Sequence, residues 1–280
     1  MTLSEKLRAV KELTLALGEK KKRRHRNSPA LWATEMGLLL DADGEPTKPD
    51  PWQVVMLDSP QSRICLNIHR QGGKSTMSSL ICLHKALFKP GSLSLIVAPA
   101  LRQSQENFRK IRDIIELLPG GYCPEFDEST KLSLRFANGS RILSLPGGNE
   151  GKTIRGFSRP DVIVEDEAAQ CSDELHAAIL PMMLTNPACK FILCSTPFGQ
   201  RGHFYKIMTD GGHEWLKQTL KASDNPRISR AFLAEQRNSP LGPWYYQQEY
   251  ECEFIAGETQ LISHESILKA MDSGITTIEI

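Results

Sequence analysis

The chain has 280 residues, of which 40% are hydrophobic and 24% charged, and its formal net charge is +1. This composition is typical of a globular protein with room for one large domain and a smaller appendage, and it provides no global basic field for nucleic acid. No apolar run approaches the length of about 18 residues that a transmembrane helix requires, and the N-terminus lacks the apolar core and cleavage site of a secretory signal.

The N-terminal stretch is predicted to be helical and basic. Residues 3–19 place leucine and valine at spacings of three and four, which predicts a short amphipathic helix. The basic run at 20–26 predicts either a solvated, partly disordered tail or a contact with nucleic acid or a partner. A second helix is predicted over 29–40, and the turn-rich stretch 41–51 is predicted to be a linker.

From residue 51 onward, apolar runs alternate with helical patterns. This alternation predicts an α/β fold with a mostly parallel sheet flanked by helices. A hairpin is predicted over 132–145, around the Asn138-Gly139 turn. Strands are predicted at 64–68, at 92–100, at the start of DVIVEDEAA (161–169) and in KFILCSTPFG (190–199), where the strand ends at Ser195 or Thr196; the helices between them run from the end of the 67–79 stretch to 88, over 101–118 and over 172–184.

After about residue 210 the character of the sequence changes. Helical patterns at 229–238 and 243–252 predict a small subdomain beside the sheet. We therefore divide the chain into an N-terminal helical and basic segment (1–50), a core (51–210) and a C-terminal lid or linker subdomain (211–280). Seven scattered cysteines, none with CxxC spacing, indicate buried free thiols in a reducing compartment rather than disulfides or zinc ligands.

The stretch NIHRQGGKSTMSS, residues 67–79, contains half of a phosphate-binding motif. Gly73, Lys74 and Ser75 fit the second half of G-x-x-x-x-G-K-[ST], whereas Ile68 stands where the first glycine belongs. The stretch lies between a predicted strand and a predicted helix, as the motif requires. Backbone N–H groups at the helix start would cradle phosphate, Lys74 would reach the β- and γ-phosphates, and the Ser75 hydroxyl would hold Mg²⁺.

A second motif follows about 90 residues later. In VIVEDEAA an apolar strand runs into Asp166 and Glu167, which matches a Walker B element. Asp166 would coordinate Mg²⁺ through water, and Glu167 would polarise the attacking water. Glu165 precedes them, and strand alternation places it on the same face as Glu167; we interpret it as a solvated or structural carboxylate.

HRQGGKST, VIVEDEAA and CSTPFG together resemble the ATPase domain of large terminase subunits, the motors that package DNA into phage and herpesvirus capsids. The resemblance runs from about Trp52 to Phe254. It implies a P-loop NTPase fold of the RecA-like, ASCE type with a small helical lid, and ATP and Mg²⁺ as cofactors. Such motors carry an arginine within the start of the P-loop, which accounts for Ile68 and Arg70.

The resemblance also implies roles for individual residues. Gln53 would recognise adenine, unless it is an ordinary exposed amide beside a buried Trp52. Arg70 would sense or stabilise the γ-phosphate from within the subunit. Ser195 and Thr196 would lie beside the γ-phosphate and report its loss to the lid, unless they are simply a polar strand terminus. The implied nucleotide-binding residues are Gln53, Arg70, Gln71, Gly72, Gly73, Lys74, Ser75, Thr76, Ser195 and Thr196, with Ser75 and Asp166 as metal ligands.

An arginine upstream of the third strand could act on a neighbouring subunit. By resemblance, Arg155 in TIRGFSRPD would be a trans-acting finger, with Arg159 as the alternative. The basic side chains of LRQSQENFRKIRDII could touch DNA or only water. The implied catalytic residues are Glu167, Lys74, Arg70 and Arg155.

Large terminases usually carry a C-terminal nuclease with clustered acids. ETQLISHESILKA, residues 258–270, resembles the junction before it, and the last residues offer no acidic cluster, so we do not expect this chain to cleave DNA. The resemblance implies double-stranded DNA, a portal protein and a small terminase subunit as partners, and no membrane. It also implies a homo-oligomeric ring, pentameric when assembled and possible as a monomer in isolation, in the host-cell cytoplasm with transient docking on the procapsid.

The expected function is ATP-driven translocation of double-stranded DNA into a procapsid. A RecA-like helicase shares the glutamine before the P-loop and the DE pair, but it needs a second RecA-like domain, for which about 70 residues after the core leave no room. A nucleotide-binding scaffold without turnover is the other alternative. The intact Lys74, Asp166 and Glu167 argue against it.

Overall fold

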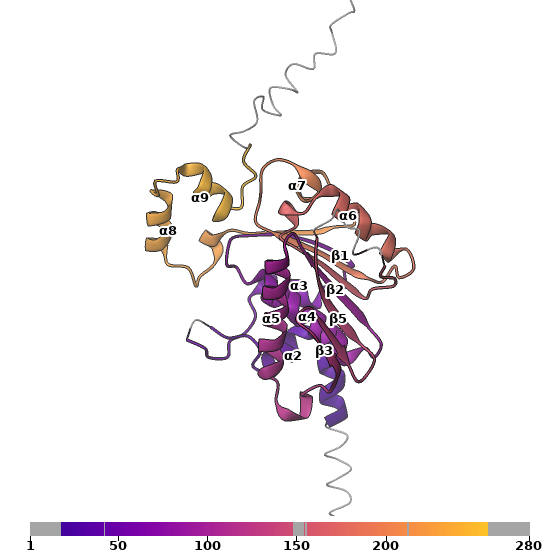
Figure 1. Ribbon diagram of the computed structural model, residues 1–280. Coiled ribbons are helices and arrows are strands. Elements are labelled where there is room, and N and C mark those ends of the chain that lie inside the picture. The colour runs from indigo at the N-terminus through magenta and orange to yellow at the C-terminus, as the bar shows by residue number, and fades with distance from the viewer. Residues whose placement is uncertain (1–17, 42, 148–153, 155, 212, 257–280) are drawn as a thin grey trace, which may run out of the picture.

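The computed structural model describes residues 18–41, 43–147, 154, 156–211 and 213–256 of the chain. In this part, one sheet runs through the molecule, helices cover both of its faces, and a small helical unit stands beside it (Figure 1). The arrangement confirms the predicted α/β fold with a mostly parallel sheet between helices.

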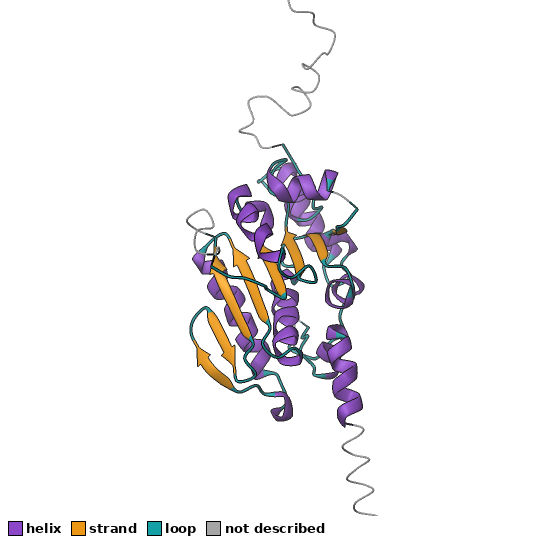
Figure 2. Cartoon of the chain, turned by 90° about the vertical axis from the view of Figure 1, so that its right-hand side faces the viewer, coloured by secondary structure: helices purple, strands orange, loops and turns teal. Residues whose placement is uncertain are grey.

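The eight-stranded sheet of the described residues has the order β3-β4-β5-β2-β6-β7-β1-β8, and Figure 2 shows its strands side by side. Neighbours from β5 to β8 are parallel, whereas β3, β4 and β5 pair in antiparallel fashion. Both β2 and β6 are buried along their whole length, as expected for strands covered on both faces. The strands are β1 (Arg63–Ile68), β2 (Leu93–Ala98), β3 (Phe126–Ser129), β4 (Ser133–Phe136), β5 (Arg141–Pro146), β6 (Val162–Asp166), β7 (Lys190–Ser195) and β8 (Leu216–Leu220).

Several helices begin where the sequence supplies a cap. Ser28, Ser172 and Ser229 each accept the backbone N–H of the residue three positions on, which satisfies a free donor of the first turn. The helices are α2 (Pro29–Glu35), α3 (Pro51–Asp58), α4 (Lys74–Phe88), α5 (Leu101–Glu116), α6 (Asp173–Ile179), α7 (Gly202–Asp210), α8 (Arg230–Arg237) and α9 (Pro243–Glu249), with 3₁₀ turns η1 (Gly120–Tyr122), η2 (Ala168–Gln170), η3 (Leu180–Met183) and η4 (Ala222–Asp224).

Alternation along the strands divides the core into two layers. Ile64 and Leu66 of β1 pack into a cluster with α2, α3, α4 and α5, whereas Cys65 between them packs into a cluster with α6, η2 and α7. The phosphate-binding stretch and the helix that follows it therefore lie on the first face. The second face carries the segments that follow β6 and β7.

Most predicted elements are confirmed, with shorter boundaries. The hairpin turns at Asn138-Gly139, where Gly139 takes φ 82°, and β4 pairs with β5. The predicted helix over 29–40 ends earlier, because Gly37 adopts a left-handed conformation and the Leu38 N–H caps the Ala33 carbonyl. The helix predicted over 172–184 gives way to η3, since Pro181 has no N–H for the helical ladder.

Four of the helices and strands were not predicted: α3, β3, α7 and β8. The strand β8 lies beyond residue 210, where we placed the end of the core, yet it pairs in parallel with β1 at the edge of the main sheet. Its side chains are only partly buried, so it lacks the strong apolar run by which the central strands were recognised. The sheet thus extends into the segment that we had assigned to the lid.

The basic run at 20–26 is not a disordered tail, because residues 18–27 are helical. His25 within it is fully buried, and its Nε2 lies 2.8 Å from Glu35 Oε2 while its Nδ1 lies 3.1 Å from Tyr122 Oη. These contacts hold the helix against α2 and η1. The remaining basic side chains of the run are exposed.

The segment α2 belongs to the core of the sheet. Trp32 is fully buried, and its ring meets His84 and Phe88 of α4 at centroid distances of 5.4 Å and 6.0 Å. Aromatic contacts of this kind add to the stabilisation that burial of apolar area provides. The N-terminal helical segment and the α/β core are therefore packed as one unit in the described residues.

Residues 222–250 form a small unit that we call the helical subdomain. Its helices α8 and α9 pack around Ala222, Leu233 and Tyr246, and Figure 1 shows them beside the end of the sheet. They confirm the two helical patterns predicted at 229–238 and 243–252.

Two further predictions concern cysteines and membranes. All seven cysteines are free and all but Cys123 are buried, as the sequence indicated. Among the described helices, none is both long and apolar enough to cross a membrane.

We expect Trp32→Ala to lower the free energy of unfolding by about 3–5 kcal/mol, because it leaves a large cavity between α2 and α4. Urea denaturation of the chain measures this value. The matched control is Leu40→Ala, at a side chain that is 42% exposed, for which we expect a change within about 0.5 kcal/mol. Equal effects of the two substitutions would mean that α2 does not unfold with the sheet.

Candidate nucleotide site

The loop between β1 and α4 has the geometry of a phosphate cradle. Gln71 and Gly73 take left-handed conformations, with φ of 60° and 88°. Gly73 is the N-cap of the 15-residue helix α4 and provides no side-chain cap, so the N–H groups of the first turn remain open to an anion. A Cβ at Gly72 would lie 2.5 Å from Ile68 Cγ2 and 3.1 Å from the His69 carbonyl oxygen, so only glycine fits there.

Lys74 lies folded against the end of β1. Its side chain is buried, and Nζ donates to the carbonyl oxygens of Ile68 at 3.0 Å and His69 at 3.3 Å. The ammonium group therefore lies at the loop and is bonded to the backbone of that loop.

The predicted metal ligands are brought together. Ser75 Oγ donates to Asp166 Oδ2 at 3.2 Å, across 91 positions of sequence. Asn107 Nδ2 donates to the same carboxylate oxygen at 2.8 Å, and Cys194 Sγ lies 3.3 Å from the other. Asp166 thus stands at the end of β6 with its Oδ2 directed at the start of α4.

Asn107 was missed by the sequence reasoning, which considered only the basic side chains of α5. The signal was present: Ser104, Asn107 and Ile111 lie on the buried stripe of this helix at spacings of three and four. A polar residue on an apolar stripe must find a buried partner, and the partner of Asn107 is Asp166. Of the basic side chains, Arg112 donates to the Thr130 carbonyl oxygen and lies over the Phe108 ring.

Glu167 leaves the strand in a left-handed conformation, with φ 51° and ψ 45°. This conformation is uncommon for a residue with a side chain and is found where surrounding structure enforces it, often at functional sites. Ser195 Oγ donates to Glu167 Oε2 at 3.4 Å. Burial raises the pKa of Glu167, the nearby Asp166 and Glu249 carboxylates add to this, and Lys74 opposes it.

Ser195 ends β7, which confirms the predicted strand terminus. Its hydroxyl also reaches the Thr196 carbonyl oxygen at 2.7 Å, and both residues are buried. Ser195 therefore touches the carboxylate that the Walker B pattern singled out. No contact of Thr196 with the phosphate loop occurs among the described hydrogen bonds.

Gln53 is not an ordinary exposed amide. It is buried at the start of α3, and its Oε1 accepts the Asp50 backbone N–H at 2.8 Å. Its Nε2 lies 3.6 Å from the position that a Cβ on Gly73 would occupy. The glutamine therefore borders the phosphate loop.

A cavity of about 850 Å³ opens between the loop, the start of α3 and the helical subdomain. It is larger than one nucleotide requires, and its walls combine backbone of the loop with polar and aromatic side chains. The residues that matter here are Gln53, Arg70, Gly73, Thr76, Arg227 and Tyr250.

Arg70 points toward the helical subdomain. Its guanidinium Nη1 lies 3.6 Å from Glu249 Oε2, and its backbone N–H donates to the Glu249 carbonyl oxygen at 3.0 Å. The side chain is 64% exposed, so this ion pair adds little to stability. Arg70 lines the cavity but is held by the subdomain at its border.

Of the two candidate trans-acting arginines, Arg159 is within the described residues. Arg155 lies outside the described residues. Arg159 is exposed, has φ 56° and precedes β6. Lys74 follows the C-terminal end of β1, whereas Arg159 precedes the N-terminal end of β6. Because β1, β7 and β6 are parallel, Arg159 and the phosphate loop of its own chain lie at opposite ends of the strands.

Glu165 is not solvated, and it does not share a site with Glu167. It is fully buried on the second face of the sheet, where it contacts His176 and His203. The alternation of side chains along a strand does not apply to Glu167, because the chain has already left β6 and turned at this residue.

The loop that joins β1 to α4, with Asp166 at the end of β6 and β7 between the two strands, is the arrangement of a P-loop NTPase with the RecA-like fold. A family model for the N-terminal part of the T4likevirus-type terminase large subunit matches residues 65–270. The match covers most of the chain, and the chain belongs to this family.

Solved structures agree with this assignment at the level of the fold. The ATPase domain of the Thermus phage P74-26 large terminase aligns with a TM-score of 0.62 at 23% identity, over 74% of this chain and 94% of that one. The HK97 bacteriophage large terminase aligns with a TM-score of 0.68 at 17% identity, over 82% of this chain and 55% of that one. A large terminase of a thermophilic bacteriophage, solved with ADP, aligns with a TM-score of 0.55 at 11% identity, over 70% and 49%.

We expect Gly72→Ala to lower the free energy of unfolding by about 1–3 kcal/mol, because the new methyl group overlaps Ile68 and the loop must move. The same movement should weaken binding of a fluorescent ATP analogue. Gly120→Ala is the control, since a Cβ there meets nothing within 4 Å. If Gly72→Ala matched this control in both measurements, the close contact with Ile68 would not constrain the loop.

Proposed function

We propose that this chain binds ATP with Mg²⁺, hydrolyses the ATP, and uses the reaction to move double-stranded DNA into a procapsid. The observation that carries the proposal is the position of Glu167. It is a half-buried carboxylate beside Ser195, and it directly follows the residue that accepts a hydrogen bond from Ser75 of the phosphate loop. The family to which the chain belongs supports the direction of the inference.

ATP would bind with its phosphates on the loop and its base in the cavity. The open N–H groups at the start of α4 suit a phosphate, and the helix dipole adds to the attraction. Gln53 has a buried amide at the cavity wall and could read the hydrogen-bonding edge of adenine. A structural neighbour of this chain was solved with ADP, which is consistent with nucleotide binding.

Mg²⁺ would be held by Ser75 and Asp166. A hydroxyl and a carboxylate at 3.2 Å are hard oxygen donors of the kind that Mg²⁺ prefers, so the residues present fit the ion. Asn107 fixes the carboxylate by its own hydrogen bond, which keeps the oxygens directed at Ser75. When bound, Mg²⁺ neutralises charge on the phosphate oxygens.

Glu167 would orient and deprotonate the attacking water. Burial and neighbouring carboxylates raise its pKa, which makes it a better proton acceptor than an exposed glutamate. Ser195 restrains the carboxylate from the neighbouring strand. The left-handed backbone at Glu167 would keep this side chain on the side of Lys74 and the phosphate loop.

Two positively charged side chains, Lys74 and Arg70, would move to the phosphates. Lys74 would exchange the Ile68 and His69 carbonyl oxygens for β- and γ-phosphate oxygens. Arg70 would exchange Glu249 for the γ-phosphate, to which its planar guanidinium can form forked hydrogen bonds. Because Glu249 belongs to the helical subdomain, occupancy by ATP and release of that subdomain would be linked.

The helical subdomain would act as the lid of the motor. Ser195 and Thr196 lie between Glu167 and the segment that leads to α7, so loss of the γ-phosphate at Glu167 could be passed on along this segment. The lid would then move the bound DNA. The hydrogen bond between Ser195 and Glu167 would change during the ATPase cycle, and this change would signal the loss of the γ-phosphate.

Partners are proposed from family membership. They are double-stranded DNA, a portal protein, a small terminase subunit and further copies of the chain in a ring, assembled in the host-cell cytoplasm on a procapsid. Arg155 or Arg159 would complete the site of a neighbouring copy. Arg159 is exposed at the N-terminal ends of the parallel strands, away from the phosphate loop of its own chain, so its side chain could reach such a copy. Cleavage of DNA is not assigned to this chain.

We expect Glu167→Gln to reduce ATP turnover by about 10²–10⁴-fold, since it removes the proton acceptor and preserves shape. Lys74→Ala should abolish turnover and weaken binding of ATP. Turnover is measured by phosphate release at several protein concentrations, with and without double-stranded DNA, and DNA should stimulate the wild-type chain.

The matched control for this experiment is Glu174→Gln, at an exposed glutamate of α6, which should leave turnover unchanged. Tight ATP binding without turnover, even at high protein concentration with DNA and portal protein, would instead support the nucleotide-binding scaffold. Strand separation of a forked duplex would support the helicase.

We expect Arg70→Ala to reduce turnover on the order of 10³-fold while ADP binds as in the wild type, because only ATP presents the γ-phosphate. Arg70→Lys should not restore turnover, since an ammonium cannot form the forked contact. Arg230→Ala, at an exposed arginine of α8, is the control. Full turnover by Arg70→Ala would leave the Glu249 ion pair as the whole role of this side chain.

A further inference from the structure

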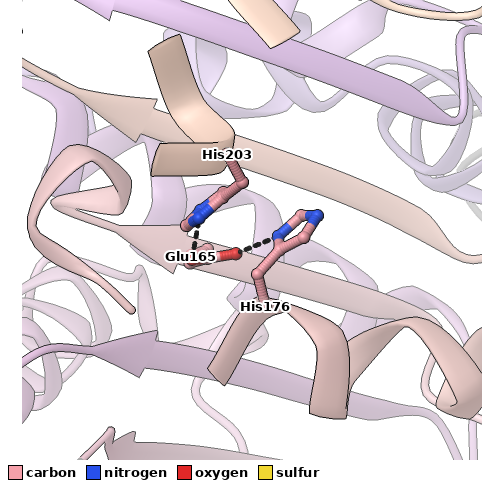
Figure 3. A group of neighbouring side chains, drawn as sticks. All are labelled: Glu165, His176 and His203. Carbon is pink, nitrogen blue, oxygen red and sulfur yellow. Dashed lines mark hydrogen bonds and ion pairs between the residues drawn. The ribbon is translucent and has the colours of Figure 1, made fainter. Parts of the chain in front are cut away.

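A second cluster of polar side chains lies on the face of the sheet opposite the phosphate loop. Glu165 comes from β6, His176 from α6 and His203 from α7, and Figure 3 shows both imidazole rings turned toward the one carboxylate. All three side chains are buried. One ligand atom from each lies within 4.8 Å of those from the others.

The contacts within this cluster are unequal. His176 Nδ1 lies 2.9 Å from Glu165 Oε2 in hydrogen-bonding geometry. His203 Nε2 lies 2.8 Å from Glu165 Oε1, but neither of these two atoms has an aligned hydrogen-bond partner in the described part of the structure. Buried polar atoms without an aligned partner are rare and destabilising, so this contact needs a physical explanation.

The other nitrogen of His203 restricts what that group can be. Nδ1 lies 3.2 Å from Asp173 Oδ1, and the same oxygen accepts the His203 backbone N–H at 2.7 Å. A carboxylate accepts and does not donate, so Nδ1 carries the ring proton and Nε2 faces Glu165 with its lone pair or with a second proton. A lone pair facing a carboxylate oxygen at 2.8 Å is repulsive. A proton shared between the ring and the carboxyl group, or a metal ion between the ligands, would remove this repulsion.

A second proton on the His203 ring is one way to remove the repulsion between His203 Nε2 and Glu165 Oε1. Burial favours the neutral ring of His203, but Glu165 and Asp173 outweigh burial and raise its pKa. The poor alignment of Nε2 with Oε1 is unfavourable for this solution, because a ring N–H donates in one direction only. A metal ion need not lie on the line that joins the two atoms.

We propose that Glu165, His176 and His203 bind a first-row transition-metal ion, Zn²⁺ in the first place, through two imidazole nitrogens and one carboxylate oxygen. The donor set suits Zn²⁺ and its neighbours, whereas Mg²⁺ prefers oxygen ligands. The hydrogen bond from His203 Nδ1–H to Asp173 is the outer contact that metal-bound histidines usually make. The two rings are stacked with centroids 4.1 Å apart, so both nitrogens approach the carboxylate from one side.

Binding requires a small adjustment of the ligands. Tetrahedral coordination at about 2.0–2.1 Å separates ligand atoms by about 3.3 Å. His176 Nδ1 and His203 Nε2 lie 2.9 Å and 2.8 Å from different oxygens of Glu165, so both rings have to shift to share one ion. His176 is the most accessible member, with a side chain that is 11% exposed, and an ion would enter past its exposed edge.

The site would join three elements. Glu165 precedes Asp166 on β6, and His203 lies on α7, just after the segment that follows β7. A bound ion would fix α6 and α7 to the strand that carries the carboxylates of the nucleotide site. The inference does not depend on ATP hydrolysis, since the ion would bind on the opposite face of the sheet.

The test is a titration of the chain, without a polyhistidine tag, with Co²⁺ after treatment with a chelator. We expect one equivalent of Co²⁺ to bind with the visible absorption of a tetrahedral site, and Zn²⁺, but not Mg²⁺, to displace it. His203→Gln and His176→Gln should each abolish this absorption. Asp173→Asn should weaken the affinity about 10–100-fold, the effect expected for an outer contact of a metal ligand.

Two control variants locate the ion. His213→Gln removes an exposed histidine, and Asp166→Asn removes the acidic ligand proposed for Mg²⁺; both should keep the absorption. Circular dichroism checks that each variant is folded, and the Asp173→Asn comparison remains if a histidine variant is not. A folded wild-type chain that binds no Co²⁺ or Zn²⁺ stoichiometrically, or that binds them as well after His203→Gln, would overturn the proposal and leave the protonated ring.

Discussion

The enclosure of β6 is the constraint on which the rest of the site depends. This strand lies between β2 and β7 and is buried along its whole length, so its side chains must alternate between two packed faces. Asp166 enters the face of α4 and α5, where Ser75 and Asn107 donate to it. Glu165 enters the other face and meets two histidines. One strand thus places charge in two buried environments, and each charge is stable only because its neighbours provide donors.

The turn after β6 separates the roles of the three consecutive acids. Had the strand continued, Glu167 would have joined Glu165 on the second face. The left-handed backbone at Glu167 turns it instead toward Lys74 and Ser195. The conformation is unfavourable for a residue with a Cβ, and the buried contacts on either side of it stabilise it.

Much of this arrangement could be predicted from the sequence. Apolar runs revealed the central strands. The G-K-S and D-E patterns predicted that Ser75 and Asp166 lie close together, as they do, because the C-terminal ends of parallel strands lie on the same side of a sheet. The edge strand β8 could not be found, since its half-buried residues resemble those of a loop. The pairing of His176 with His203 could not be found either. They are far apart in sequence, and only the packing of α6 against α7 brings their rings together.

The helical subdomain is attached to the sheet at both of its ends. At its entry, the Leu220 carbonyl oxygen accepts the His69 N–H; at its exit, the Cys252 carbonyl oxygen accepts the Asn67 side chain. Between these ends the subdomain also contacts the loop through the Arg70 N–H and the Glu249 carbonyl oxygen, and contacts Asp50 through Arg227. Rotation about the line that joins the two ends therefore requires these inner contacts to break. Both points are bonded to residues just before the phosphate loop, Asn67 in β1 and His69, so the position of that line depends on the loop as well as on the subdomain. Any displacement of the loop backbone tilts the axis itself, and the far ends of α8 and α9 move further than the loop does.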